Sequence, residues 1–233
     1  MKRISLPVLL AGALCFIGSA SAQYNMPPGS AEDLEATYNT AIDNRTTAII
    51  TSLKLENADK AARVRDIIIA QYRTLRARDE AIDSLLKLQG KEVNFKNRAA
   101  LLQSESKPLH DKFLAKLSAE LTPEQVEIVK NKMTYNKVQV TYDAYCSIFP
   151  DLTDADKAEI QEKLKTAREE AIDGGSAAEK SAIFQKYKDQ INDYLNAHGH
   201  DVAKAYKDWE AKQQASNQKS PGGSAGEAAP TNK

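Results

Sequence analysis

The sequence of 233 residues contains only two cysteines, Cys15 and Cys146, and a single tryptophan. Because so few thiols cannot form a disulfide framework, the folded state must depend on an apolar core. Acidic and basic side chains number 32 each, so the formal net charge is zero. This balance gives no electrostatic footprint for nucleic acid and little for anionic lipid.

The sequence also lacks several short motifs that accompany catalysis. It has no glycine-rich phosphate loop, no H-E-x-x-H and no C-x-x-C. Serine, histidine and aspartate are present, but no spacing in the sequence brings them together. We therefore predict no catalytic residue, no cofactor and no metal ligand, while an enzyme remains the alternative.

The N-terminus has the three parts of a secretory signal peptide. Lys2 and Arg3 precede an apolar run over residues 4–17, and Ala20-Ser21-Ala22 forms a small-residue cleavage site. The run is shorter than the roughly twenty residues that span a bilayer as a helix. We expect residues 1–22 to be removed after Ala22, residues 23–29 to form a short linker, and the protein to be periplasmic or secreted. Cys146 would then be a lone thiol, and its apolar surroundings predict that it is buried and inert.

Apolar residues recur every three or four positions through most of the chain, which predicts helices. The expected helices begin after caps and end before glycines, and one of them contains Pro108, which predicts a kink or a split there. They are expected after Ser30, after Asn57 up to Gly90, over about 94–119, from Thr122 to about Met133, over about 138–148, after Thr153 up to Gly174-Gly175, after Ser176 up to Gly199, and after Asp201.

These features predict an all-α domain over residues 30–214, packed either as a multi-helix bundle or as two stacked helical halves. Residues 215–233 are rich in Ser, Gly, Pro and Ala and contain no large apolar side chain. Such a segment cannot bury enough surface to offset its ordering entropy, so we predict a disordered C-terminal tail.

The stretch MTYNKVQVTYDAY, residues 133–145, alternates like a strand. No partner strand is visible, and an isolated strand is not stable. Read as a helix, Val138, Tyr142, Tyr145 and Phe149 form one stripe at spacings of four, three and four. We therefore interpret residues 134–137 as a joint between two helices and expect Tyr135 to be exposed there.

Two similar strings, LENADKA at 55–61 and LTDADKA at 152–158, precede predicted helices, and LTPEQVE at 121–127 is a looser third copy. The similarity has two explanations, convergent capping chemistry or an internal duplication. Both remain open at this point.

Two polar clusters contain the residue types of functional sites. His198-Gly199-His200-Asp201 contains metal-ligand types, but without a third ligand at a readable spacing it is better interpreted as a turn in which Asp201 caps a helix. Glu169, Glu170 and Asp173 could act in acid–base chemistry, but charge runs of this kind usually mark a solvated helix face.

Several long strings resemble the exported bacterial family known as domain of unknown function 3826 over most of residues 35–210: LHDKFLAKLSAELTPEQVEIVKNKMTY, VTYDAY, AREEAIDGGSAAEKSAIFQKYKDQINDYL and GHDV. The resemblance implies a signal-bearing protein of bacteria that degrade complex polysaccharides. The chain departs from the family pattern at His200 and at Asp189-Gln190, which puts in doubt any metal or anion site built on these positions.

The LT-x-x-Q helix starts are also similar, over short segments, to periplasmic chaperones of the Spy and CpxP type, which implies a concave client-binding surface and often a homodimer. Two functions follow as hypotheses. The first is a non-enzymatic binding or chaperone-like module of the bacterial envelope, with an unfolded protein as client. The second is an enzyme or accessory factor acting on complex glycans, for which the candidate ligand-binding residues are Tyr135, Arg168, Glu169, Lys186 and Asn192.

Overall fold

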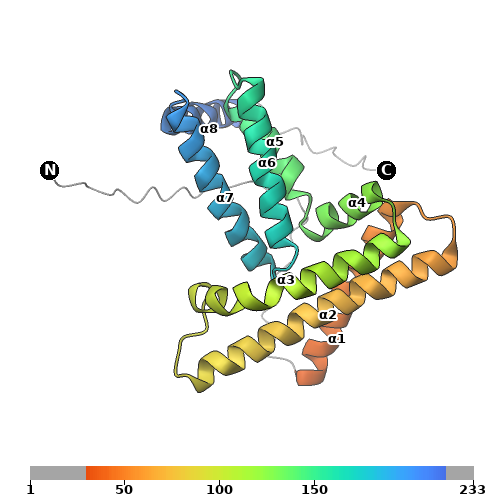
Figure 1. The fold of residues 1–233 in the computed structure, drawn as a ribbon. Helices are drawn as coiled ribbons and strands as arrows, with labels where there is room; N and C mark the ends of the chain where they lie inside the picture. The colour runs from red at the N-terminus through yellow and green to blue at the C-terminus, as the bar shows by residue number, and fades with distance from the viewer. Residues whose placement is uncertain (1–29, 219–233) are drawn as a thin grey trace, which may run out of the picture. The chain divides into compact units, whose positions relative to one another are not determined.

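The computed structural model describes residues 30–218 (Figure 1), so the predicted signal peptide, the linker and the remainder of the predicted tail lie outside the described residues. Every regular element in this range is an α-helix, and the all-α prediction is confirmed. The helices are α1 (Ala31–Leu53), α2 (Ala58–Leu88), α3 (Phe95–Glu120), α4 (Pro123–Met133), α5 (Lys137–Ile148), α6 (Asp154–Ala171), α7 (Ala177–Ala197) and α8 (Val202–Gln218).

The chain divides into two compact units, one up to Tyr38 and the other from Asn39 onward. The described part of the first unit is the beginning of α1. There the Ser30 amide donates to Asp33 Oδ2 at 2.9 Å, and the Asp33 amide donates to Ser30 Oγ at 3.2 Å. This reciprocal pair satisfies donors that the first turn of a helix leaves free, so the predicted start is confirmed.

The second unit contains the other predicted caps. Thr122, Thr153 and Ser176 each form a complete capping box with the residue three positions on, and the Asn57 side chain accepts from the Lys60 amide. Gly90 and Gly199 follow the ends of α2 and α7 with φ of 65° and 95°. These left-handed conformations cost glycine little, which explains why both helices end there.

The helix starts also bear on the repeated strings. In α2 the cap is Asn57, so the string Ala-Asp-Lys-Ala begins at the first helical position. In α6 the cap is Thr153, so the same string begins at the second position. The two copies are therefore one residue out of register relative to their caps, which favours convergent capping chemistry over a duplication.

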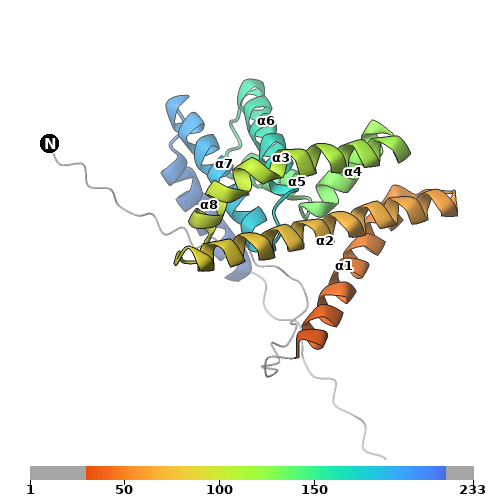
Figure 2. The same cartoon turned by 60° about the horizontal axis from the view of Figure 1, so that its bottom comes forward.

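Two apolar clusters form the core of the second unit. One joins α5 to α8 and the loops between them, and the other joins α1 to α4 and includes Ile172 from the end of α6. Helices α2 and α3 lie side by side, as do α6 and α7, and α4 packs against α6 (Figures 1 and 2). This arrangement corresponds to two helical halves, one of the two predicted architectures.

The α4–α5 joint is where the sequence predicted it. Tyr135 and Asn136 have φ of 59° and 53°, and α5 begins at Lys137. The Tyr135 side chain is 41% exposed, as expected, whereas Tyr145 and Phe149 lie in the core with Val138 and Tyr142 packed against them. The helical interpretation of residues 138–148 is therefore confirmed.

Three details differ from the prediction or extend it. Helix α3 continues through Pro108, because its packing along α2 outweighs the single backbone hydrogen bond that proline removes. Helix α8 extends to Gln218, past the predicted boundary at 214, since Glu210–Ala215 are mostly strong helix formers. Cys146 is half-buried at the edge of the C-terminal core, so the prediction of a buried thiol is wrong. Over residues 30–218, no helix is long and apolar enough to cross a membrane.

Candidate functional site

A cleft of about 570 Å³ lies where α3, the end of α6 and the start of α7 meet. Each helix contributes residues at helical spacing, so one face of each forms a wall. The α3 wall is Ala99, Leu102, Ser106, Lys107, His110 and Asp111; the α6 side is Glu169, Glu170, Asp173 and Gly174; the α7 wall is Glu179, Ile183 and Lys186. Nine of the thirteen lining residues are polar or charged, but the surface that they expose to the cleft is more apolar than polar.

His110 and Asp173 form the central pair of the cleft. His110 Nδ1 lies 2.8 Å from Asp173 Oδ2, and His110 Nε2 lies 3.9 Å from Glu169 Oε2. The hydrogen bond to Asp173 raises the pKa of His110, although burial of the ring opposes this shift. The imidazole is therefore held by a carboxylate at one nitrogen while the other points toward a second carboxylate.

Asp173 is only 6% exposed, and its two side-chain oxygens differ. Oδ2 is bonded to His110, whereas Oδ1 is buried without a hydrogen-bond partner among the described residues. Buried polar atoms are nearly always paired, so an unpaired carboxylate oxygen in the wall of a cleft requires an explanation. A donor supplied by a ligand is one, and because Oδ1 itself has almost no exposed surface, such a donor reaches it only with a small movement of the Asp173 side chain.

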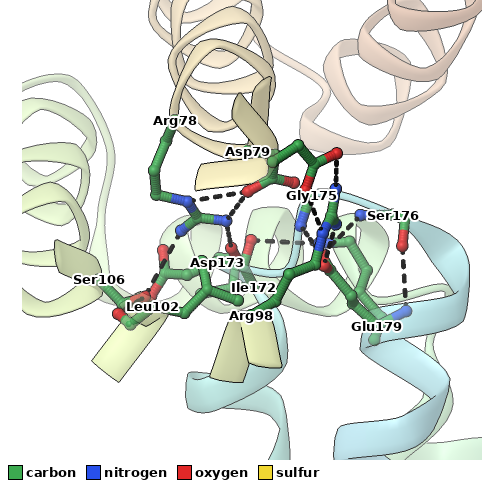
Figure 3. Close-up of polar contacts among 12 residues, drawn as sticks. Arg78, Asp79, Arg98, Leu102, Ser106, Ile172, Asp173, Gly175, Ser176 and Glu179 are labelled. Atoms are coloured by element: carbon green, nitrogen blue, oxygen red, sulfur yellow. Dashed lines mark hydrogen bonds and ion pairs between the residues drawn. The ribbon is translucent and has the colours of Figure 1, made fainter. Parts of the chain in front are cut away.

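The turn that carries Asp173 is fixed from α2, as Figure 3 shows. Arg78, itself 9% exposed, donates through Nη2 to the Asp173 carbonyl at 2.9 Å and to Asp79 Oδ1 at 2.7 Å. Asp79 lies so close to Gly175 that a Cβ built on this glycine would be 1.6 Å from Asp79 Oδ2. Gly175 therefore permits a close approach between α2 and the turn.

A second set of contacts in Figure 3 fixes the start of α7. The Gly175 and Ser176 amides donate to Glu179 Oε2 at 2.8 and 3.3 Å. The other oxygen of Glu179 accepts from Arg98 Nη1 at 2.6 Å, and Arg98 also pairs with Asp83. The cap of α7 is thus tied to α3 and, through Asp83, to α2.

Two of the predicted ligand-binding residues, Arg168 and Glu169, lie together beside His110. Glu169 lines the cleft and accepts from Lys130 Nζ at 3.0 Å. Arg168 is buried behind it, donating to Glu169 Oε1 at 2.8 Å and to Asn131 Oδ1 at 2.7 Å. Arg168 therefore positions Glu169 and does not itself line the cleft.

The other three candidates are separated by the fold. Lys186 lines the cleft and pairs with Glu170 at 3.0 Å. Asn192 accepts from the Tyr145 hydroxyl at 2.9 Å, next to the C-terminal core and away from the cleft walls. Tyr135 lies at the α4–α5 joint with Arg45 over its ring, 5.9 Å from the centroid.

Sequence reasoning missed His110 and treated Asp173 as part of a solvated face. A lone histidine at residue 110 carries no motif, and its partner lies 63 residues away. The only local signal was the acidic run at 169–173 ending directly before two glycines. The two histidines of the 198–201 turn have separate partners. His198 Nδ1 donates to the Tyr194 carbonyl at 2.8 Å, and His200 Nε2 lies 3.3 Å from Asp156 Oδ2. No group of three or more metal-ligating side chains occurs among residues 30–218.

Comparison with known proteins identifies the family. The family model described as "Protein of unknown function (DUF3826)" matches residues 39–215, which is well over half of the chain. The chain therefore belongs to this family, and the matched range contains every residue that lines the cleft. No curated protein matches the chain.

Proposed function

We propose that this member of the DUF3826 family is a non-enzymatic binding module whose cleft holds a neutral, hydroxyl-rich ligand such as a fragment of a glycan. The observation that carries the proposal is Asp173 Oδ1, which is buried in the cleft wall and lacks a donor. Leaving a buried acceptor unpaired costs about 1–3 kcal/mol, more when it is charged. A ligand hydroxyl donating to this oxygen removes that cost.

The charges around the cleft favour a neutral ligand. Lys107 pairs with Asp111 at 2.7 Å and Lys186 with Glu170 at 3.0 Å. The remaining carboxylates are paired as well: Asp173 with His110, Glu169 with Lys130, and Glu179 with Arg98. A charged ligand would compete with these pairs for their charged groups, whereas hydroxyl groups can bond to both members of a pair without separating them.

The hydrogen bonds also support binding over catalysis. Ser106 is the only hydroxyl-bearing residue among the described residues that line the cleft, and it donates to the Leu102 carbonyl at 2.8 Å. Its proton is therefore not directed to His110, as nucleophile activation requires. His110 Nε2 faces Glu169, so the two groups balance each other electrostatically.

A chaperone-like role has less support. Holding an unfolded client requires a contiguous apolar surface. In the second unit, the exposed large hydrophobic side chains lie on separate segments: Leu85 and Leu88 at the end of α2, Val93 in the next loop, Tyr135 at the α4–α5 joint, and Val140 in α5. In the cleft, nine of the thirteen lining residues are polar or charged, and its apolar surface is broken up among them. We place the binding module in the periplasm or outside the cell, on the strength of the N-terminal signal pattern alone.

Isothermal titration calorimetry of the purified protein against neutral oligosaccharides from plant and microbial polysaccharides tests the proposal. Asp173→Asn keeps the shape of the side chain and its bond to His110 but presents an NH₂ group where the free acceptor was. Loss of one hydrogen bond to a charged acceptor is worth about 1.5–3 kcal/mol, so affinity should fall roughly ten- to hundred-fold.

Asp193→Asn is the matched control, because Asp193 is exposed on α7 and does not line the cleft. It changes the charge by the same amount and should leave the affinity unchanged. No detectable binding of any oligosaccharide in a broad panel, or equal effects of the two substitutions on the affinity, would refute the proposal.

A further inference from the structure

A second cavity, of about 270 Å³, lies between the end of α5, the following loop and α8. It shares no lining residue with the cleft described above. Its walls are Ser147, Ile148, Phe149, Pro150 and Asp151 on one side, and Gly199, His200, Asp201, Lys204, Ala205, Asp208, Trp209 and Lys212 on the other. Trp209 is the only tryptophan of the chain.

The indole of Trp209 is arranged to offer carbon surface to this cavity. Its single polar atom, Nε1, donates to Ser147 Oγ at 3.2 Å. The side chain is half-buried and lines the cavity, so part of the ring is accessible. With its N–H already bonded, the ring can contribute only apolar and π contacts to a ligand.

The base of the cavity is rigid. Phe149 is 2% exposed and meets His200 and Tyr206 edge to face, with ring centroids 6.0 Å apart in each case. His200 is held in turn by Asp156, since Nε2 lies 3.3 Å from Asp156 Oδ2. Because these side chains are already fixed, they lose little conformational entropy when a ligand binds.

Polar groups surround this aromatic surface. The Asp151 side chain is 76% exposed, and its Oδ2 lies 3.7 Å from His200 Nδ1, so the carboxylate can still accept a hydrogen bond on its solvent side. Lys204 and Asp208 form an i,i+4 pair at 2.6 Å on the solvent side of α8, which offers both a donor and an acceptor. An aromatic face beside donors and acceptors of both kinds suits a ring that has C–H groups on one face and hydroxyls around its edge.

We propose that this cavity binds one neutral pyranose ring, which stacks on Trp209 and donates a hydroxyl hydrogen bond to Asp151. The volume lies just below the roughly 300–1,000 Å³ of typical small-molecule sites, so a single ring fits better than a chain. The ligand class is the one proposed for the cleft, but the observations that carry it are independent of the cleft. A glycan could therefore be held at two places on the same protein.

The sole tryptophan makes the site directly observable. Intrinsic fluorescence is recorded while the protein is titrated with the methyl pyranosides of glucose, galactose, xylose and rhamnose, and separately with tetramethylammonium chloride. We expect a saturable change in emission with at least one glycoside. Asp173→Asn should leave this change intact, because the signal does not come from the cleft.

Two substitutions near the cavity complete the test. Asp151→Asn should weaken the apparent affinity at least five-fold, whereas Asp154→Asn should not, because Asp154 is fully exposed at the first position of α6 and does not line the cavity. The proposal is overturned by any of four results: no saturable change with the glycosides, a change that Asp173→Asn abolishes, equal responses of the Asp151 and Asp154 variants, or saturation by tetramethylammonium alone.

Discussion

Replacing Gly175 by alanine tests how the turn beside the cleft is held. A Cβ at this position would lie 1.6 Å from Asp79 Oδ2 and 2.6 Å from Asp79 Cγ. Asp79 cannot retreat freely, because its other oxygen accepts two bonds from Arg78, at 2.7 and 3.0 Å, and both side chains are largely buried. The substitution must therefore displace either the turn or the Arg78–Asp79 pair.

The expected cost is that of overpacking in a constrained site, about 1–3 kcal/mol. For a chain of this size each kcal/mol lowers the Tm by roughly 2–4 °C, so Gly175→Ala should lower it by roughly 2–12 °C. Differential scanning calorimetry or urea unfolding measures this. Gly174→Ala is the neighbouring control, since its Cβ would lie 3.1 Å from Lys180 Cγ and 3.2 Å from the Ala171 carbonyl, which is tight but can be relieved by small shifts.

A double-mutant cycle identifies the cause. In an Asp79→Ala background the clashing carboxylate is gone, so adding Gly175→Ala should cost less than about 0.5 kcal/mol. A Gly175→Ala protein as stable as the wild type would refute the reasoning. A full penalty that persists without the Asp79 carboxylate would refute it equally.

Three further predictions concern titration and capping. Burial lowers the pKa of Lys180 to about 8, below its unfolded value of about 10.4. Between these values the unfolded chain binds more protons than the folded protein, so the free energy of unfolding should rise between pH 8 and pH 10. Urea titrations at several pH values measure this rise, and Lys180→Met should flatten it. The hydrogen bond to Asp173 raises the pKa of His110, so the stabilisation by this pair is complete below about pH 6.5 and is lost as pH rises through the folded pKa. NMR titration should show a lower pKa for His110 in Asp173→Asn. An unchanged pKa would mean that Asp173 does not cause the shift. The Thr153 hydroxyl caps α6 by accepting from the Asp156 amide at 3.2 Å. Thr153→Ala should therefore lower the free energy of unfolding by about 0.5–2 kcal/mol, while Thr153→Ser should lower it much less. Equal losses of stability in the two variants would mean that the capping bond is not responsible.

Much of the fold could be predicted because its signals are local. A capping box involves residues three apart, and a helical stripe repeats within a few turns, so the starts at Thr122, Thr153 and Ser176 were readable from the sequence. The left-handed pair at Tyr135 and Asn136 was located only as a gap between two stripes. Its backbone conformation was not predictable from the residue types, since neither is glycine.

The site depends on contacts that no local pattern records. His110 is hydrogen-bonded to Asp173, which lies 63 positions further along the chain, and Arg78 donates to the Asp173 carbonyl, which lies 95 positions further along. Gly174-Gly175 was interpreted as a helix stop, whereas Gly175 is required by the approach of Asp79 from α2. Of the candidate ligand-binding residues, Glu169 and Lys186 line one cleft, whereas Tyr135 and Asn192 belong to other parts of the fold, because helix packing, not sequence order, decides which faces meet.

The central claim is that the cleft beside His110 and Asp173 receives the ligand. Following the imidazole nitrogens of His110 by NMR during titration with the oligosaccharide panel tests it most directly, because Nδ1 shares the Asp173 carboxylate with the expected ligand hydroxyl. The account predicts a saturable shift of these resonances in the wild-type protein and its loss in Asp173→Asn but not in Asp193→Asn. Binding that leaves the His110 nitrogens unmoved would contradict it.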